Sequence, residues 1–243
     1  MPFEPTSHAE ALVRALERSH ALHEARAANP ILGGALERIA DWQSRRLAHT
    51  YADLARDPRY AGAIAFFQSD LYGPQDFSRR DADLSRIVPV MTRMLPDPVI
   101  ATVARAMELS VLSHELDARL LENLPRANGE FTVDEYCRAF RRAGRLADRR
   151  RQIELIGEVG TALDRYVRKP LIRSALALMR APARAAGLGE LQTFLERGFD
   201  AFRTMNGADV FLATIRTREN ALIDSIFDGA SAPFPEPPLR KRA

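Results

Sequence analysis

Six motifs that start α-helices are spread along this chain, and they constrain its fold more than any other sequence feature. In three of them an asparagine or aspartate precedes a proline: Asn29-Pro30, Asp57-Pro58 and Asp97-Pro98. An N-cap oxygen accepts a hydrogen bond from a free backbone N–H, and proline suits the first turn because its missing N–H would have no partner there. The other three are capping boxes, in which two residues satisfy each other's backbone N–H groups: Ser7 with Glu10, Ser78 with Asp81, and Thr132 with Glu135. We therefore expect a series of separate helices.

Apolar residues recur with the helical period between these motifs. Along residues 148–169, one apolar stripe is formed by Ile153, Ile156, Val159, Leu163 and Tyr166. No segment alternates apolar and polar residues as a half-buried strand does. We predict an all-α protein with one bundle-like domain of about eight to ten helices, residues 1–228. A disordered, proline-rich and basic tail is expected at residues 229–243.

The composition limits the compartment and the kinds of partner. Only Lys169 and Lys241 of the 35 basic residues are lysine, and 32 acidic residues nearly balance them, which leaves a net charge of +3. We attribute this arginine-rich composition to a GC-rich bacterial genome and not to selection for a polyanion. The single cysteine, Cys137, excludes an intrachain disulfide and a cysteine-based metal cluster. No secretory signal and no run of about 18 apolar residues is visible, so we expect a cytoplasmic protein that does not enter the membrane.

The most distinctive segment is FFQSDLYGPQDFSRRDADLSR, residues 66–86. Gly73-Pro74 interrupts a helix there, and charged side chains crowd the corner that follows. One hypothesis is a polar pocket that contacts a ligand through residues of this corner: Asp70, Tyr72, Asp76, Arg79, Arg80 and Asp81. The alternative is a structural corner in which the carboxylates cap helices and pair with arginines. Capping and ion pairing account for most of these charges, which favours the structural corner.

The same segment resembles the signature of an uncharacterised bacterial family of helical proteins, FF-x-x-DLYG-x-x-DF-x-x-RD, which begins here at Phe66. A second similar stretch is LALMRAPARAAGLGELQTFLERGFDAFRTM, residues 176–205, so the resemblance extends over about residues 30–227. The resemblance implies a helical domain and assigns no activity or catalytic residue.

The only spacing typical of a metal site lies in the first predicted helix. Glu17 and His20 form a Glu-x-x-His motif, with which di-iron bundles point two ligands inward, and His23 follows on nearly the same face. His114 lies on another apolar stripe and is placed to approach His20 in a bundle. One alternative is therefore a metal- or haem-dependent enzyme, di-iron-like or haem oxygenase-like, that binds iron or haem through these four residues. The chain has no second Glu-x-x-His, so our first expectation is no cofactor and histidines with one hydrogen-bond partner each.

Basic residues gather where a helix predicted at 132–147 meets the next, predicted at 148–169. Arg138, Arg142, Arg145 and Arg149 follow one another at i, i+4, i+7 and i+11, which places them on one helical face. Phosphate contacts require such a face, so nucleic-acid binding is a second alternative. Few aromatic residues are interleaved for base stacking, and a solvated face paired with acidic residues is the simpler interpretation.

The sequence contains no Walker loop, no nucleophile elbow and no dinucleotide-binding glycine motif. Whether the chain is an enzyme stays open. Abundant apolar stripes favour a non-enzymatic helical protein that binds a protein partner or assembles as a homo-oligomer.

Overall fold

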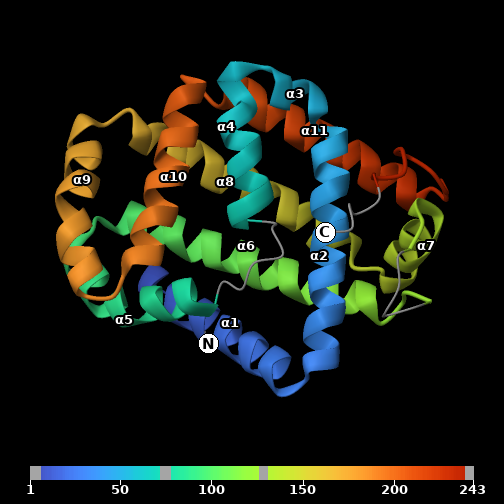
Figure 1. Cartoon of the computed structure of the whole chain (residues 1–243), viewed down its shortest axis with the longest axis horizontal. Helices are drawn as coiled ribbons and strands as arrows, with labels where there is room; N and C mark the ends of the chain where they lie inside the picture. Colours follow the sequence, from blue (N-terminus) through green and yellow to red (C-terminus); the bar gives the residue numbers. More distant parts are fainter. Residues whose placement is uncertain (1–6, 72–77, 126–130, 239–243) are drawn as a thin grey trace, which may run out of the picture.

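The computed structural model describes residues 7–71, 78–125 and 131–238, and it is all-α within these ranges (Figure 1). No strand occurs in this part of the chain, so the predicted fold class is confirmed. Eleven α-helices and one π-helical turn follow in order: α1 (His8–Ala28), α2 (Pro30–Thr50), α3 (Ala52–Arg56), α4 (Pro58–Phe66), η1 (Phe67–Leu71), α5 (Ser78–Met94), α6 (Asp97–Leu121), α7 (Val133–Ala143), α8 (Leu146–Val167), α9 (Pro170–Ala185), α10 (Gly189–Met205) and α11 (Asp209–Phe227).

Most of the predicted helix starts form as expected. Both bonds of the capping box are present at the starts of α1 and α7. Asn29 accepts a hydrogen bond from the backbone N–H of Leu32, and Asp57 caps α4 in the same way. The prediction is wrong for Asp97, which is the first residue of α6 and makes no cap. Its carboxylate instead lies 2.8 Å from Nδ1 of His8, in α1.

Over the described residues there are more helices than the eight to ten expected, and one reason is that the segment between the Asn29-Pro30 and Asp57-Pro58 starts forms two helices, α2 and α3, divided at Tyr51. Tyr51 has non-helical backbone angles, φ −110° and ψ 21°, and its side chain is buried. Pro89 lies inside α5, and the helix continues past it to Met94.

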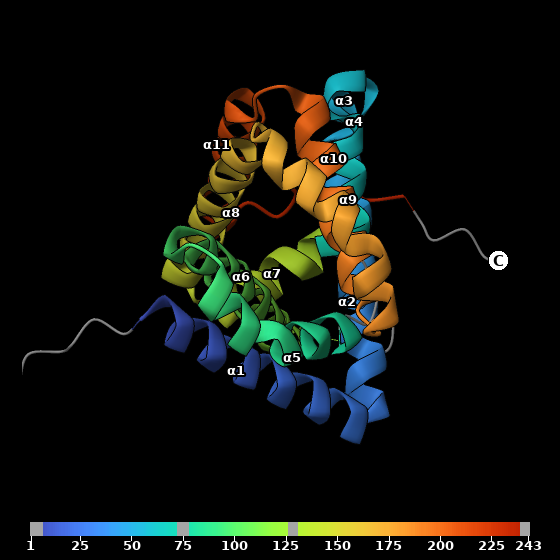
Figure 2. The same ribbon diagram turned by 90° about the vertical axis from the view of Figure 1, so that its left-hand side faces the viewer.

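The helices pack around three apolar clusters. One surrounds Trp42 and joins α2, α7, α8 and α11; a second surrounds Phe202 and joins α4, α10 and α11. A third surrounds Met107, where α1 lies across α5 and α6. Figure 2 shows α8 and α11 on one side of the molecule, α4 and α10 on the other, and α1 and α6 across one end. The first two clusters meet in the interior, where the candidate site lies.

Residues 229–238, for which the sequence predicts disorder, pack against α2 and α7. Phe234 is 7% exposed and contacts the ring of Trp42, with centroids 6.2 Å apart. The backbone N–H of Val133 donates to Oε1 of Glu236 at 2.8 Å. An aromatic anchor outweighs the proline-rich composition here, because its burial compensates for the lost chain entropy. Residues 239–243 lie outside the described residues.

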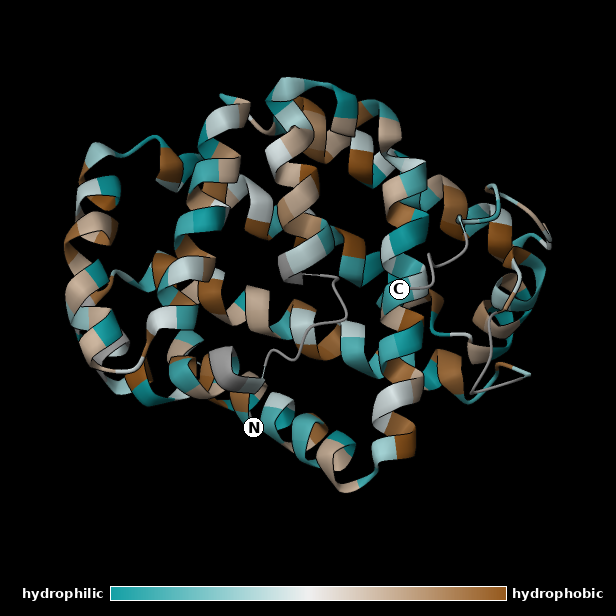
Figure 3. Ribbon diagram, viewed as in Figure 1, coloured by the Kyte–Doolittle hydropathy of each residue, from teal (hydrophilic) through white to brown (hydrophobic). Residues whose placement is uncertain are grey.

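Figure 3 shows hydrophobic and hydrophilic residues alternating around most helices, as expected for a bundle with an apolar interior. None of the described helices is both long and apolar enough to cross a membrane.

Candidate functional site

Of the predicted polar corner, the structure places one side chain. Tyr72 and Asp76 lie outside the described residues, and so do the side chains of Asp70, Arg79 and Arg80. Asp81 in α5 is 4% exposed. Its Oδ2 atom accepts a hydrogen bond of 2.6 Å from the hydroxyl of Ser19 in α1. Asp81 therefore points into the α1–α5 interface.

Of the four proposed metal or haem ligands, His23 in α1 contacts Asp81 at this interface and also contacts His114 in α6. Nε2 of His23 lies 3.3 Å from Oδ2 of Asp81, and the rings of His23 and His114 lie edge to face, with centroids 5.7 Å apart. Glu17 and His20 are exposed and lie apart from this pair; Nδ1 of His20 is 3.5 Å from Glu24. Among the described residues, no three His, Cys, Asp or Glu side chains gather in a group able to hold a metal ion.

The predicted arginine face does not form as one surface, because the chain changes direction between α7 and α8. Gly144 has φ 66° and Arg145 has φ 62°, so the helix stops after Ala143 and restarts at Leu146. Of the four arginines, Arg138 pairs with Asp134 and Arg145 pairs with Asp148, while Arg142 is exposed on α7. The fourth, Arg149, turns inward and is 5% exposed. A single basic face over both helices is therefore wrong.

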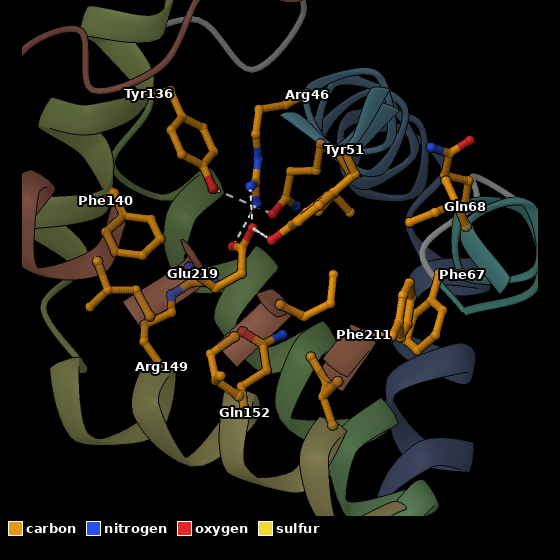
Figure 4. Close-up of a pocket in the computed structure, with 17 residues that line it drawn as sticks. Arg46, Tyr51, Phe67, Gln68, Tyr136, Phe140, Arg149, Gln152, Phe211 and Glu219 are labelled. Carbon is orange, nitrogen blue, oxygen red and sulfur yellow. Dashed lines mark hydrogen bonds and ion pairs between the residues drawn. The ribbon is translucent and has the colours of Figure 1, made fainter. Parts of the chain in front are cut away.

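Arg149 lines a cavity of about 80 Å³ between α2, α4, η1, α7, α8 and α11 (Figure 4). Isoleucine, leucine and phenylalanine side chains form much of its wall, and the rings of Phe67 in η1 and Phe211 in α11 lie side by side, with centroids 5.8 Å apart. Eight polar or ionisable residues complete the lining, among them Gln43, Arg46, Tyr51, Tyr136, Gln152 and Glu219. A cavity of this size has room for roughly five to eight water-sized atoms.

On one side of the cavity, the Glu219 carboxylate forms an ion pair with Arg46 and accepts a hydrogen bond from Tyr51. Arg46 donates to both of its carboxylate oxygens, at 2.7 and 3.2 Å, and the Tyr51 hydroxyl donates to Oε1 at 2.7 Å. Burial alone would lower the pKa of Arg46, but Glu219 outweighs it and holds that pKa above its ordinary value. Burial, reinforced by Glu219, raises the pKa of Tyr51. The two charges of this pair therefore compensate each other.

A hydrogen-bonded chain leads from the cavity to α6. The hydroxyl of Tyr136 donates to Oε1 of Gln43 at 3.4 Å, and Nε2 of Gln43 donates to Asp117 at 2.8 Å. Burial raises the pKa of Tyr136 to about 12. Burial also raises the pKa of Asp117, while Gln43 and Arg149 oppose that rise. The neutral form of Asp117 is therefore favoured more than in water.

Arg149 also lines the cavity, but unlike Arg46 it has no carboxylate bound directly to its guanidinium. Its guanidinium lies 4.3 Å over the ring of Phe140, and its Nη2 donates to the backbone carbonyl of Leu116 at 3.3 Å. No carboxylate among the described residues is within ion-pair distance of it. Burial lowers the pKa of Arg149, but a guanidinium still stays charged at neutral pH. Arg149 therefore lines the cavity as a charged group with one hydrogen bond, to a backbone carbonyl, and no bound carboxylate.

Sequence reasoning missed most of this cavity, although a signal existed. Phe211, Ile215, Glu219 and Ile223 are four residues apart and form an apolar stripe that contains one carboxylate. In α8, Arg149 lies four residues before Ile153 and seven before Ile156, so it also shares a helical face with apolar residues. A charged residue on an apolar stripe indicates a buried charge, and a buried charge needs a partner or a function.

The fold and this site define an all-α protein with an ionisable cavity in its interior. The chain belongs to the family described as Domain of unknown function (DUF8198), which matches residues 22–233. No curated protein and no solved structure matches the chain. The family agrees with the uncharacterised family expected from the sequence, and its description assigns no activity.

Proposed function

We propose that this chain is a binding protein whose interior cavity holds a small molecule with one carboxylate group and an apolar body. The observation that carries the proposal is Arg149, a buried guanidinium that lines the cavity without a directly bound carboxylate. A buried charge without a counter-ion costs free energy, and proteins tolerate that cost mainly at functional sites.

The chemistry of the cavity selects the ligand. A carboxylate accepts two parallel hydrogen bonds from a guanidinium, and this pairing is stronger inside a protein than in water. The remaining wall is largely isoleucine and phenylalanine, which favours an aliphatic or aromatic body over a second charged group. The volume limits the ligand to roughly five to eight non-hydrogen atoms.

The same residues favour binding over catalysis. None of the residues that the structure describes as lining the cavity is His, Ser, Cys or Lys. Glu219 is the one carboxylate among them, and Arg46 and Tyr51 already occupy it. The iron or haem alternative and the nucleic-acid alternative remain predictions with less support from the geometry, as do a bacterial origin and a cytoplasmic location.

Pairs of ligands that differ only in charge test the proposal. Pentanoate and pentanamide have the same size, and only pentanoate has the carboxylate. We expect pentanoate at about one hundred times its Kd to stabilise the protein by about 2.7 kcal/mol. This corresponds to a rise of roughly 5–10 °C in the melting temperature. Pentanamide should give no such rise.

Matched variants locate the binding site. Arg149→Met should abolish the rise with pentanoate, while Arg142→Met, at an exposed arginine of α7, should keep it. The proposal is wrong if pentanamide stabilises the wild type as much as pentanoate does, or if the rise persists in Arg149→Met. Absence of any rise across aliphatic carboxylates of three to six carbons would also contradict it.

A further inference from the structure

The outer face of α9 combines exposed apolar residues with an excess of positive charge. Leu171, Leu178 and Met179 are 84%, 76% and 52% exposed, and we call these three residues the α9 ridge. Leu171 and Leu178 are seven residues apart and share one helical face. The opposite side of the helix packs on α10 through Ile172 and Leu176. Figures 1 and 2 show α9 at the edge of the molecule, next to α10.

Basic residues surround the ridge. The chain contains no acidic residue between Asp164 and Glu190, and the six basic residues in that stretch are Arg165, Arg168, Lys169, Arg173, Arg180 and Arg184. Two are neutralised, because Arg168 lies 2.5 Å from Asp164 and Arg180 lies 2.6 Å from Glu196. Arg173 has no partner among the described residues. The local net charge is therefore positive.

A surface hollow lies beside the ridge. It is lined by Arg168, Arg173 and Arg203, together with Ser174 and Ala177. Ser174 and Ala177 are small and exposed, and on the helix they stand between the ridge and Arg173. A segment that crosses this face can approach the α9 backbone closely, with leucines on one flank and arginines on the other.

We infer that this face docks an acidic, amphipathic segment of a partner protein. Apolar side chains of such a segment would cover the α9 ridge, and its carboxylates would reach Arg173 and the hollow. Charge complementarity of this kind fixes orientation and speeds association, while burial of leucine supplies most of the affinity.

Charge, exposed leucines and surface shape argue against three other occupants. A second copy that placed α9 on α9 across a two-fold axis would bring like-charged arginines together, because such an interface is self-complementary. A nucleic acid would contact the arginines but would leave the exposed leucines without an apolar partner. A bilayer surface accepts an amphipathic basic helix, but a flat surface does not fill the hollow.

A synthetic helical peptide serves as the probe. It has 18 residues, leucine on one face, glutamate on the others and a terminal fluorophore, and its control has lysine in place of every glutamate. We expect the glutamate peptide to bind in fluorescence anisotropy and the lysine peptide not to bind. Leu178→Asp and Arg173→Glu should each weaken binding about tenfold or more.

Two further variants control for charge and exposure. Ile31→Asp changes an equally exposed apolar residue, 73% exposed, and Arg14→Glu changes an exposed arginine of α1. Both should keep the affinity within about twofold.

The inference is overturned if the glutamate peptide does not bind, or if Leu178→Asp leaves its affinity unchanged. Three further assays test the other occupants: self-association in sedimentation, binding to phosphatidylcholine–phosphatidylserine vesicles, and retention of duplex DNA. The inference is also overturned if the peptide does not bind and Leu178→Asp abolishes one of these three interactions.

Discussion

The buried ion pair of Arg46 and Glu219 allows the effect of one buried charge on the stability of the fold to be measured. Their bidentate pair, completed by the Tyr51 hydroxyl, is nearly removed from water, since Arg46 is 9% exposed. Removing one partner leaves the other charge buried without compensation, which typically destabilises a protein by about 3–5 kcal/mol. We therefore expect Glu219→Ala to lower the free energy of unfolding by that amount in urea denaturation.

An exposed pair provides the control for Glu219→Ala. Asp53 binds Arg218 through both oxygens at the surface, and Arg218 holds the pKa of Asp53 at about 2. Solvent screens this pair, so Asp53→Ala should cost less than about 1 kcal/mol. Equal losses in the two variants would show that burial of the Arg46–Glu219 pair is unimportant.

The raised pKa of Asp117 affects how the stability of the protein depends on pH. A carboxylate in an ordinary ion pair stabilises the folded state as the pH rises, whereas Asp117 stabilises it as the pH falls. Burial raises its pKa in the folded state above 3.8, the value for the unfolded chain. Between these two values the folded state binds more protons than the unfolded state, so stability rises as the pH falls through that window. Asp117→Asn keeps the hydrogen bond from Gln43 and removes the titration. Urea denaturation from pH 7 to pH 4 should show the wild type gaining stability relative to this variant; a constant difference would contradict the assignment.

At the scale of elements, helix starts were predictable and helix ends were not. The caps at Asn29 and Asp57 depend on a residue and its nearest neighbours, so a local pattern specifies them. The sequence predicts a break between residues 147 and 148, but the helix ends earlier, at Ala143, and Arg145 adopts φ 62°, which arginine does rarely. That break turned Arg149 from a predicted surface arginine into a cavity residue.

Two glycines test this account of the α7–α8 break. Gly144 has φ 66° and ψ −131°, a conformation that residues with a Cβ avoid, and a Cβ there would meet nothing within 4 Å. The effect of Gly144→Ala is therefore conformational, and we expect a loss of about 1–3 kcal/mol. Gly157 lies inside α8, also with open space, so Gly157→Ala should add about 0.5–1 kcal/mol. Thermal denaturation of both variants measures the contrast, and the same sign in both would refute it.

The candidate site was predictable only in part. The stripe of α11 that contains Glu219 is visible in the sequence, and so is the stripe that begins at Arg149. Which stripes face one another is a property of packing between helices distant in sequence, and a single sequence does not encode it as a local pattern. For the same reason Asp81 and His23, predicted as parts of two different sites, meet in one interface.

At the scale of the whole molecule, the described end of the chain contributes to the core. Phe234 packs on Trp42 and Tyr136, and Arg46 lies 5.7 Å from the centre of its ring. A chain that ends at Asp228 should lose about 3–5 kcal/mol of stability, since it loses a buried phenylalanine. A chain that ends at Pro238 should keep wild-type stability. Equal stability of the two truncated chains in urea would exclude a structural role for residues 229–238.

The central claim is that Arg149 lies in the cavity for a ligand and not for the fold. The free energy of unfolding of Arg149→Met, without added ligand, tests it most directly. Methionine fills a similar volume and removes the buried charge, so the value should stay within about 1 kcal/mol of the wild type or rise. A loss of about 3–5 kcal/mol would show that Arg149 and Asp117 form a structural charge pair, and it would contradict the claim.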